Sequence, residues 1–387
     1  MDHPRCLLDA ARKLHADMVD RLGTLVTLES APGSLPHLGS CADLLARWGE
    51  ESLGRPARRV VIDGLPHLLW SAADQRVLLL GHFDTVFPVG TVRARPFTVR
   101  GDTATGPGVC DMKAGIVQMF TALRLIEDTS AVGVLLTCDE ESGSLTSRPL
   151  IEREARRSGA VLVCEAATAE GHVKVARKGG SVYRLTVRGR AAHAGVEPQR
   201  GVNATVEVAH QILALAALGA SDSGGTSVTP TLLSAGTTTN TVPEHANLAV
   251  DVRAWTRAEL ERVDTAIRGL VPYLPEAALS VQGGINRYPM SPALAQPLLK
   301  LARSIGRQLG IENLGGAHAA GASDGNFTAA LGVPTLDGLG AVGGGAHGAD
   351  EYVCLDRMPE RTALLAGLVE AASTMEPARL RAIDEIP

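Results

Sequence analysis

The chain has 387 residues, a length that predicts two or three domains. Hydrophobic residues make up 45% and charged residues 20%, which excludes a disordered chain. The net charge of −5 argues against a nucleic-acid partner, and we find no apolar run near the roughly 18 residues of a membrane span. Six cysteines without a CxxC pair indicate free thiols, so we expect a cytoplasmic protein.

The first part of the sequence alternates between helical and strand patterns. Apolar residues at helical spacing predict helices over 7–27, 42–53, 112–126 and 145–157. Short apolar runs predict strands over 59–63, 67–71, 77–81, 132–137 and 160–164. This alternation is typical of an α/β domain with a mostly parallel sheet sandwiched by helices.

The pattern changes after Lys174. Strands are expected at 181–187, 227–234, 246–254 and 279–282, with helices at 202–218 and 258–271. This β-α-β-β-α-β order is that of a ferredoxin-like α+β module. Helix 292–309, strand 333–336 and helix 358–373 then resume the α/β pattern. We therefore predict a discontinuous domain over 1–176 and 287–387, with an inserted domain over 177–286.

Five places at strand ends or in glycine-rich loops hold side chains of the types that bind metals: His82, Asp111, the pair Glu140 and Glu141, Glu165 and His347. Ligands of open α/β sheets bind outside the carboxyl ends of the strands, so we expect these groups to meet there. They would repel and desolvate one another unless cations neutralised them. Two imidazoles and three carboxylates suit a pair of zinc ions.

Two further residues beside these ligands suggest supporting roles. Asp84 lies two residues after His82, so on a strand it points the same way and can accept the second imidazole N–H. Glu140 and Glu141 are neighbours and face different directions on an extended chain. One can therefore bind metal while the other acts as a general base.

The linked motifs carry a resemblance to a known family. In chain order they are Gly81-His82-Phe83-Asp84-Thr85-Val86, Gly106-Pro107-Gly108 with Asp111-Met112-Lys113-Ala114-Gly115, Asp139-Glu140-Glu141-Ser142-Gly143-Ser144, and Ala192-His193-Ala194-Gly195. Together they resemble the co-catalytic zinc peptidase and amidohydrolase family. Its members include glutamate carboxypeptidase, aminoacylase, acetylornithine deacetylase and succinyl-diaminopimelate desuccinylase. The resemblance covers essentially the whole chain and is greatest to glutamate carboxypeptidase.

The resemblance implies a role for each of the five ligands. Asp111 would bridge two zinc ions, next to a cis peptide bond that would join it to Met112. His82 and Glu165 would complete one site, and Glu141 and His347 the other. Cobalt or manganese could substitute for zinc.

The resemblance also assigns the chemistry and the partners. Glu140 would be the general base, Asp84 the partner of His82, and His193 would help to hold the oxyanion. The inserted domain would act as a lid and pair in a homodimer, so that His193 reaches the active site of the partner chain. The implied reaction is hydrolysis of the amide bond of an N-acyl amino acid or small peptide with a free carboxylate.

Asn240, Arg253 and Arg287 match substrate-binding positions of the family, and an arginine fork suits a carboxylate. Each also has a purely structural interpretation, as a turn residue, an exposed strand end and a hinge residue respectively. Lys174 and Arg177 are expected to be solvated or to line a hinge, and they are the next candidates for substrate contact.

Four other residues have structural interpretations. Cys110 and Cys164 precede ligand residues and should face the opposite way, as buried packing thiols. Asp324 is expected to cap a helix N-terminus. His193 lies in a turn, where a lone histidine is most often solvated, and only the resemblance assigns it a function.

Two classes of function remain open at this point. A non-catalytic relative that serves as a binding protein would show damage among the ligands or at Glu140, and the sequence shows none there. Within the hydrolase class, a carboxypeptidase and an N-deacylase of a biosynthetic intermediate cut the same bond from opposite ends of the substrate. The sequence leaves that choice, the acyl group, the amino acid and the native metal open.

Overall fold

A computed structural model describes residues 3–220 and 224–376 and divides them into two compact units. Within the described residues, the first unit holds 3–176, 291–319 and 323–376, and the second holds the remainder. The chain returns to the first unit at Ser291, later than the expected residue 287. The reason is that Arg177 and Met290 exchange backbone hydrogen bonds, which keeps Met290 with the second unit.

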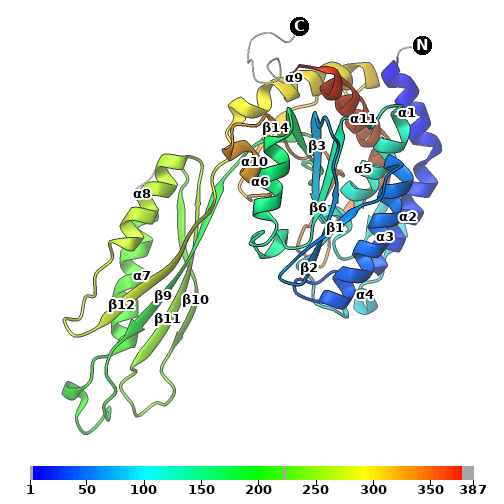
Figure 1. Ribbon diagram of the computed structural model, residues 1–387. Coiled ribbons are helices and arrows are strands. Elements are labelled where there is room, and N and C mark those ends of the chain that lie inside the picture. Colours follow the sequence, from blue (N-terminus) through cyan, green and yellow to red (C-terminus); the bar gives the residue numbers. More distant parts are fainter. Residues whose placement is uncertain (1–2, 221–223, 377–387) are drawn as a thin grey trace. The chain divides into compact units, whose positions relative to one another are not determined.

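The first unit is built on a six-stranded sheet of order β1-β2-β6-β3-β7-β14 (Figure 1). Its strands are β1 (Arg58–Ile62), β2 (Leu65–Trp70), β3 (Val77–His82), β6 (Val132–Thr137), β7 (Ala160–Val163) and β14 (Thr335–Leu336). β6, β3, β7 and β14 run parallel, whereas β1 and β2 form an antiparallel edge. Every residue of β3, β6 and β7 is buried, as expected for strands covered on both faces. The mostly parallel α/β sheet is thus confirmed.

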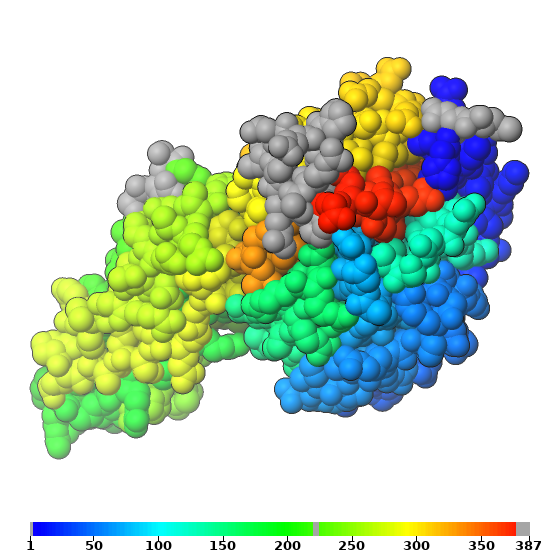
Figure 2. Space-filling model, turned by 45° about the horizontal axis from the view of Figure 1, so that its top comes forward, coloured from blue at the N-terminus to red at the C-terminus, as the bar shows by residue number. Residues whose placement is uncertain are grey.

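Helices cover both faces of this sheet (Figure 1). α6 (Arg148–Arg156) and α10 (Gly325–Ala330) cover one face, where Ile151 and Phe327 pack with Leu80 and Val163 of the strands. α3 (Leu35–Leu53), α5 (Ala114–Leu125) and α11 (Met358–Thr374) cover the other. α9 (Pro292–Leu309) contacts the edge strand β14, whereas α1 (His3–Lys13) and α2 (His15–Thr27) lie further out. α1, α9 and α11 adjoin at the surface shown in Figure 2.

Short elements complete the first unit. A four-stranded sheet of order β15-β16-β5-β4 joins β4 (Thr98–Arg100), β5 (Thr103–Thr105), β15 (Gly343–Gly344) and β16 (Tyr352–Cys354). β8 (Val173–Arg177) pairs with β13 (Gly316–Ala319), and the short helix α4 (Thr91–Ala94) precedes β4. The sequence analysis missed these elements, because strands of two to five residues are too short to show a reliable period.

The second unit is an antiparallel sheet of order β10-β11-β9-β12 with two helices. Its elements are β9 (Gly179–Arg188), α7 (Ala204–Ala220), β10 (Ser227–Ala235), β11 (His245–Ala254), α8 (Arg257–Arg268) and β12 (Ala278–Arg287). Alternate strand residues such as Leu185 and Val250 form a core with Val208 and Val263 of the helices. The residues between them face away from the helices. This is the expected ferredoxin-like topology.

Three boundaries differ from the sequence expectation. The helix expected over 7–27 is interrupted at Leu14, which separates α1 from α2. α3 begins at Leu35 instead of residue 42, and Pro36 in its first turn is compatible with a helix N-terminus. β12 extends well beyond 279–282, because it pairs along the whole of β9. Across 3–220 and 224–376, no helix has the length and apolar character needed to cross a membrane.

Candidate metal centre

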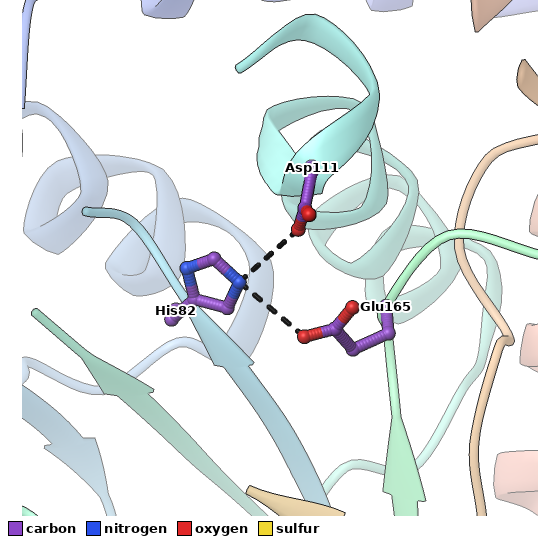
Figure 3. A group of neighbouring side chains, drawn as sticks. All are labelled: His82, Asp111 and Glu165. Carbon is purple, nitrogen blue, oxygen red and sulfur yellow. Dashed lines mark ion pairs between the residues drawn. The ribbon is translucent and has the colours of Figure 1, made fainter. Parts of the chain in front are cut away.

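The first group of ligand side chains forms around His82. His82 is the last residue of β3, and Glu165 follows the neighbouring parallel strand β7. Asp111 lies in the turn Val109–Lys113 before α5, and its peptide bond to Met112 is cis, as the resemblance implied. Nε2 of His82 lies 3.3 Å from Oδ1 of Asp111 and 3.3 Å from Oε1 of Glu165 (Figure 3). Three distant parts of the sequence thus converge on one imidazole nitrogen.

The second group shares Asp111 with the first. Nε2 of His347 lies 3.4 Å from Oδ2 of Asp111 and 3.2 Å from Oε2 of Glu141. Glu141 belongs to the 3₁₀ turn Glu140–Ser142 that follows β6, and His347 lies in the loop between β15 and β16. In each group the ligand atoms lie within 4.8 Å of one another. The structure therefore brings all five residues into two groups that meet at Asp111.

Asp84 contacts His82 of the first group and the turn that carries Glu141 of the second, and its shortest contact with His82 is made by its backbone. Nδ1 of His82 contacts the backbone carbonyl oxygen of Asp84 at 3.0 Å, and the carboxylate Oδ1 lies at 3.5 Å. The carboxylate instead accepts the backbone N–H groups of Glu140 (3.3 Å) and Glu141 (3.0 Å). Because β3 ends at His82, strand alternation no longer sets the direction of the Asp84 side chain. Asp84 thus links the His82 strand to the turn that carries both glutamates.

Glu140 occupies the start of the same 3₁₀ turn and is buried. The expectation of an extended chain at Glu140 and Glu141 is wrong, since both residues are in the turn. Consecutive side chains of a 3₁₀ turn point about 120° apart, so the two carboxylates still diverge.

Asp324 does not cap α10. It occupies the N-cap position, but its backbone is already helical (φ −61°, ψ −21°) and its side chain makes no capping hydrogen bond. Its buried carboxylate instead accepts hydrogen bonds from Thr137 Oγ1 (3.1 Å) and Ser144 Oγ. These residues flank the turn that holds Glu140 and Glu141, so the hydrogen bonds of Asp324 fix both ends of that turn.

The charges of the two groups depend on one another. Burial would lower the pKa of His82, but Asp111, Asp84 and Glu165 together raise it well above its ordinary value. Burial would likewise raise the pKa of Asp111, but His347 and His82 lower it. Hydrogen bonding to Asp111 raises the pKa of His347 to about 9. The carboxylates thus stabilise positive charge at the imidazoles, which a bound cation would supply in place of protons.

Two unsatisfied oxygens indicate that these residues fit metal ions. Among the described residues, Oδ1 of Asp111 and Oε1 of Glu141 are buried and accept no hydrogen bond of regular geometry, although Oδ1 of Asp111 lies 3.3 Å from Nε2 of His82 in an ion pair. Burial also raises the pKa of Glu141 to about 7. A buried carboxylate oxygen without a donor is costly, and a cation would satisfy it. Imidazole and carboxylate groups are ordinary ligands of zinc and related divalent ions.

Two predicted residues lie together in the second unit. His193 and Asn240 are exposed, and the backbone N–H of Ala194 donates to the carbonyl oxygen of Asn240 at 2.9 Å. Nδ1 of His193 accepts the backbone N–H groups of Gly195 (3.1 Å) and Val196 (3.2 Å). These bonds orient the imidazole within its loop.

The two predicted arginines flank one glycine. Arg253 of β11 and Arg287 of β12 both pair in register with Gly180 of β9, so they share one face of the sheet. Arg253 is half-buried, and its guanidinium binds both carboxylate oxygens of Asp251, with Nε at 2.9 Å and Nη2 at 2.8 Å. Arg287 is buried and donates to Oδ1 of Asn286 at 3.3 Å. Arg253 thus lies next to the end of β11, as expected, and is partly exposed and paired with Asp251 of the same strand.

The remaining candidates are placed as follows. Lys174 is half-buried in β8, and its backbone pairs with Asp337. Arg177 is buried and donates to the carbonyl oxygen of Gly321 at 3.1 Å, so of its two expected positions, solvated or hinge-lining, the structure fits the second: it is the first residue of the second unit. Cys110 and Cys164 are free and buried, as expected for packing thiols.

Sequence reasoning missed Glu351. Its buried carboxylate accepts backbone N–H groups from the turn that holds Asp111. Those amides lie 240 residues or more away along the chain, so no local pattern indicates the contact. The one available signal was the position of Glu351 shortly after His347.

Fold and site together define an α/β protein with paired groups of metal-type ligands, and comparison with known proteins gives its class. Residues 78–371 match the model of Peptidase family M20/M25/M40. The chain is 30% identical to carboxypeptidase G2 of Pseudomonas sp. (strain RS-16), over 94% of this chain and 91% of that protein. The chain therefore belongs to peptidase family M20/M25/M40, which confirms the expected family and makes the protein a metal-dependent hydrolase.

Two further comparisons show the breadth of this family. The chain is 29% identical to succinyl-diaminopimelate desuccinylase 2 of Shewanella loihica (strain ATCC BAA-1088 / PV-4), over 57% of this chain and 64% of that protein. Its structure is similar to that of the M20 family metallo-carboxypeptidase Sso-CP2 from Sulfolobus solfataricus, with a TM-score of 0.71 and 16% identity. That match covers 92% of this chain and 99% of the other, and it supports the fold alone.

Proposed function

We propose that this hydrolase cleaves the amide bond of an N-acyl amino acid or small peptide with a free carboxylate. The observation that carries the proposal is the meeting of two ligand groups at Asp111, beside the buried Glu140. The similarity to carboxypeptidase G2 supports the carboxypeptidase direction.

Two divalent ions, preferably zinc, with cobalt or manganese as substitutes, would bind the two groups. His82 and Glu165 would hold one ion, Glu141 and His347 the other, and Asp111 would contact both. Ions bound there would polarise the scissile carbonyl and lower the pKa of a water molecule.

Glu140 would act first as the general base and then as the general acid. Its carboxylate would accept a proton from the attacking water while the water oxygen bonds to the carbonyl carbon. It would then pass that proton to the amide nitrogen as the C–N bond breaks, which gives a free acid and a free amine. The hydrogen bond from its backbone N–H to Asp84 fixes the turn from which Glu140 acts.

His193 would donate a hydrogen bond to the carbonyl oxygen as negative charge develops on it. Nδ1 accepts two backbone N–H groups, so the proton of the neutral ring belongs on Nε2. Asn240, in the adjoining loop, would contact the same substrate.

Arg253 and Arg287 would bind the substrate carboxylate. Both arginines pair in register with the same residue of β9, which supports a joint role. The substrate would compete with Asp251 for the guanidinium of Arg253. Lys174 and Arg177 are the next candidates.

We further propose a homodimer formed through the second unit. β10 is an edge strand, and Leu232 on it is 68% exposed. Leu213 on the adjacent helix α7 is also exposed. An exposed apolar edge strand is typical of a surface that pairs with another chain. Light scattering over a dilution series tests this, and an active monomer would contradict it.

An N-deacylase role is the second candidate, supported by the similarity to a desuccinylase. A non-catalytic binding role has less support, since Glu140 and all five ligand residues are present. We propose a cytoplasmic location, because all six cysteines are free.

The direct test is a screen of N-acyl amino acids and dipeptides with the zinc-loaded protein, in which each side of the amide bond is varied independently. Glu140→Gln should keep its zinc and lose about 10²–10⁴-fold in turnover, the usual contribution of a positioned acid/base group. Near-normal turnover of this variant would show that Glu140 is not the general base. Absence of hydrolysis by the wild-type protein across the screen would overturn the proposed function.

A further inference from the structure

Glu351 carries a buried carboxylate, and only 1% of the residue's surface is exposed to solvent. Its Oε1 accepts the backbone N–H groups of Cys110 (2.8 Å) and Asp111 (2.9 Å), and its Oε2 accepts that of Gly108 (2.9 Å). The amides of Cys110 and Asp111 belong to the turn that presents Asp111 to both ligand groups, and Gly108 directly precedes that turn. One carboxylate therefore fixes the backbone of the shared ligand.

The same glutamate stands at the base of the hairpin that carries His347. It directly precedes β16, which pairs with β15 on the other side of the loop. The hairpin is tight at this point, since a Cβ added to Gly345 would lie 3.0 Å from the Cα atom of Glu351. Glu351 thus joins two segments that lie far apart in the sequence and that supply Asp111 and His347.

The second ligand group depends on such a connection more than the first. The His347 side chain is 53% exposed and its backbone has a positive φ of 66°, so burial does not fix its position. His82, in contrast, is buried at the end of the central strand β3. A loss of order between the Asp111 turn and the hairpin would disturb one ligand of the first group, Asp111, but two ligands of the second group, Asp111 and His347, so the second group is affected more.

We propose that Glu351 is a positioning residue that sets the divalent-ion affinity of the second group, formed by Asp111, Glu141 and His347. It acts through the backbone of Asp111 and through the hairpin, and it touches neither substrate nor the reacting atoms. The proposal rests on the proposed function in one respect, since it takes these side chains to be metal ligands.

Glu351→Gln is the informative variant. The amide keeps the shape of the side chain but has one acceptor oxygen, and its NH₂ group would face a backbone N–H that now has no acceptor. Glu207→Gln is a matched control in the second unit. Glu207 is also buried, and it accepts the backbone N–H groups of Tyr273 (3.0 Å) and Leu274 (2.7 Å). It lies in the unit that holds none of the five ligands.

The measurement is calorimetric titration of the metal-free proteins with zinc chloride, with circular dichroism to confirm that each is folded. The wild type should bind two ions. Glu351→Gln should bind one ion within about threefold of the wild-type affinity and the other 10–100-fold more weakly, the usual effect of losing a residue that orients a ligand. Glu207→Gln should bind both ions like the wild type, even where its melting temperature falls.

Wild-type affinity for both ions in folded Glu351→Gln would overturn the proposal, and so would equal weakening of both. If Glu351→Gln does not fold, Glu351→Asp takes its place. It keeps both oxygens on a side chain shorter by one methylene, and the same selective weakening is expected. A wild-type protein that binds fewer than two zinc ions would instead contradict the proposed function, so the two failures can be distinguished.

Discussion

The candidate ligands of the first unit and the candidate substrate contacts of the second are held in different ways. His82, Asp111 and Glu141 lie at strand ends or in turns whose backbone is fixed by buried carboxylates such as Asp84. His193 and Asn240 lie in exposed loops. The fold therefore fixes the candidate ion site by buried contacts, while two of the candidate substrate contacts lie in exposed loops and the other two, Arg253 and Arg287, lie on strands. Changes in the first region should abolish ion binding, and changes in the second should alter substrate preference.

The largest effect is expected for Asp111→Asn. Because Asp111 belongs to both groups, replacing one of its carboxylate oxygens with an NH₂ group should weaken the binding of both ions. Turnover should then fall to background. Metal analysis after gel filtration, together with the hydrolysis assay, checks this result. Asp128→Asn, an exposed aspartate of the same unit, serves as the control and should behave like the wild type. Retention of two ions by Asp111→Asn would refute the shared role.

A smaller and asymmetric effect is expected from the two histidines. His82→Ala removes a buried imidazole from between Asp111 and Glu165, and should cost about 3 kcal/mol in the free energy of unfolding of the metal-free protein. His347→Ala removes a half-exposed ring and should cost under about 1 kcal/mol. Each variant should lose one ion. Urea unfolding measures the free energy of unfolding, and metal analysis counts the bound ions. Equal destabilisation by both substitutions would show that His82 is not held more firmly in the fold than His347.

The convergence of several candidate ligands could be predicted from sequence, because the fold places residues at strand ends by a general rule. β3, β6 and β7 are apolar runs that end beside polar residues, and the carboxyl ends of parallel strands meet at one edge. His82 and Glu165 follow directly from this rule. The inserted unit was likewise predicted from the order of its strands and helices.

The partners of the supporting residues could not be predicted in the same way, although a supporting role for Asp84 itself was expected. Asp84, Asp324 and Glu351 each bind groups on segments distant in the sequence, and their partners are mostly backbone amides or hydroxyls that any residue pattern could supply. Asp324 shows the difficulty, since a local rule assigned it to a helix cap while tertiary packing turned it toward Thr137 and Ser144. The short strands around His347 have too few residues for periodicity.

The smallest effect is expected in the second unit. In the wild type, esterifying or amidating the substrate carboxylate should lower kcat/KM. The loss should correspond to about 2–3 kcal/mol of transition-state binding free energy, the scale of a lost charged hydrogen bond. Arg253→Ala and Arg287→Ala should each narrow this difference between acid and amide, while both ions remain bound. Steady-state kinetics on matched acid and amide substrates provides the comparison. If neither variant narrows the difference, carboxylate recognition belongs to other residues, with Lys174 and Arg177 next to be tested.

The shared position of Asp111 is the central claim, and anomalous diffraction at the zinc edge from crystals of the zinc-loaded protein tests it most directly. Two zinc peaks are expected in each chain. One should contact His82 and Glu165, the other Glu141 and His347, and the carboxylate of Asp111 should lie between them with one oxygen on each ion. A single peak, or two peaks of which only one contacts Asp111, would contradict the account.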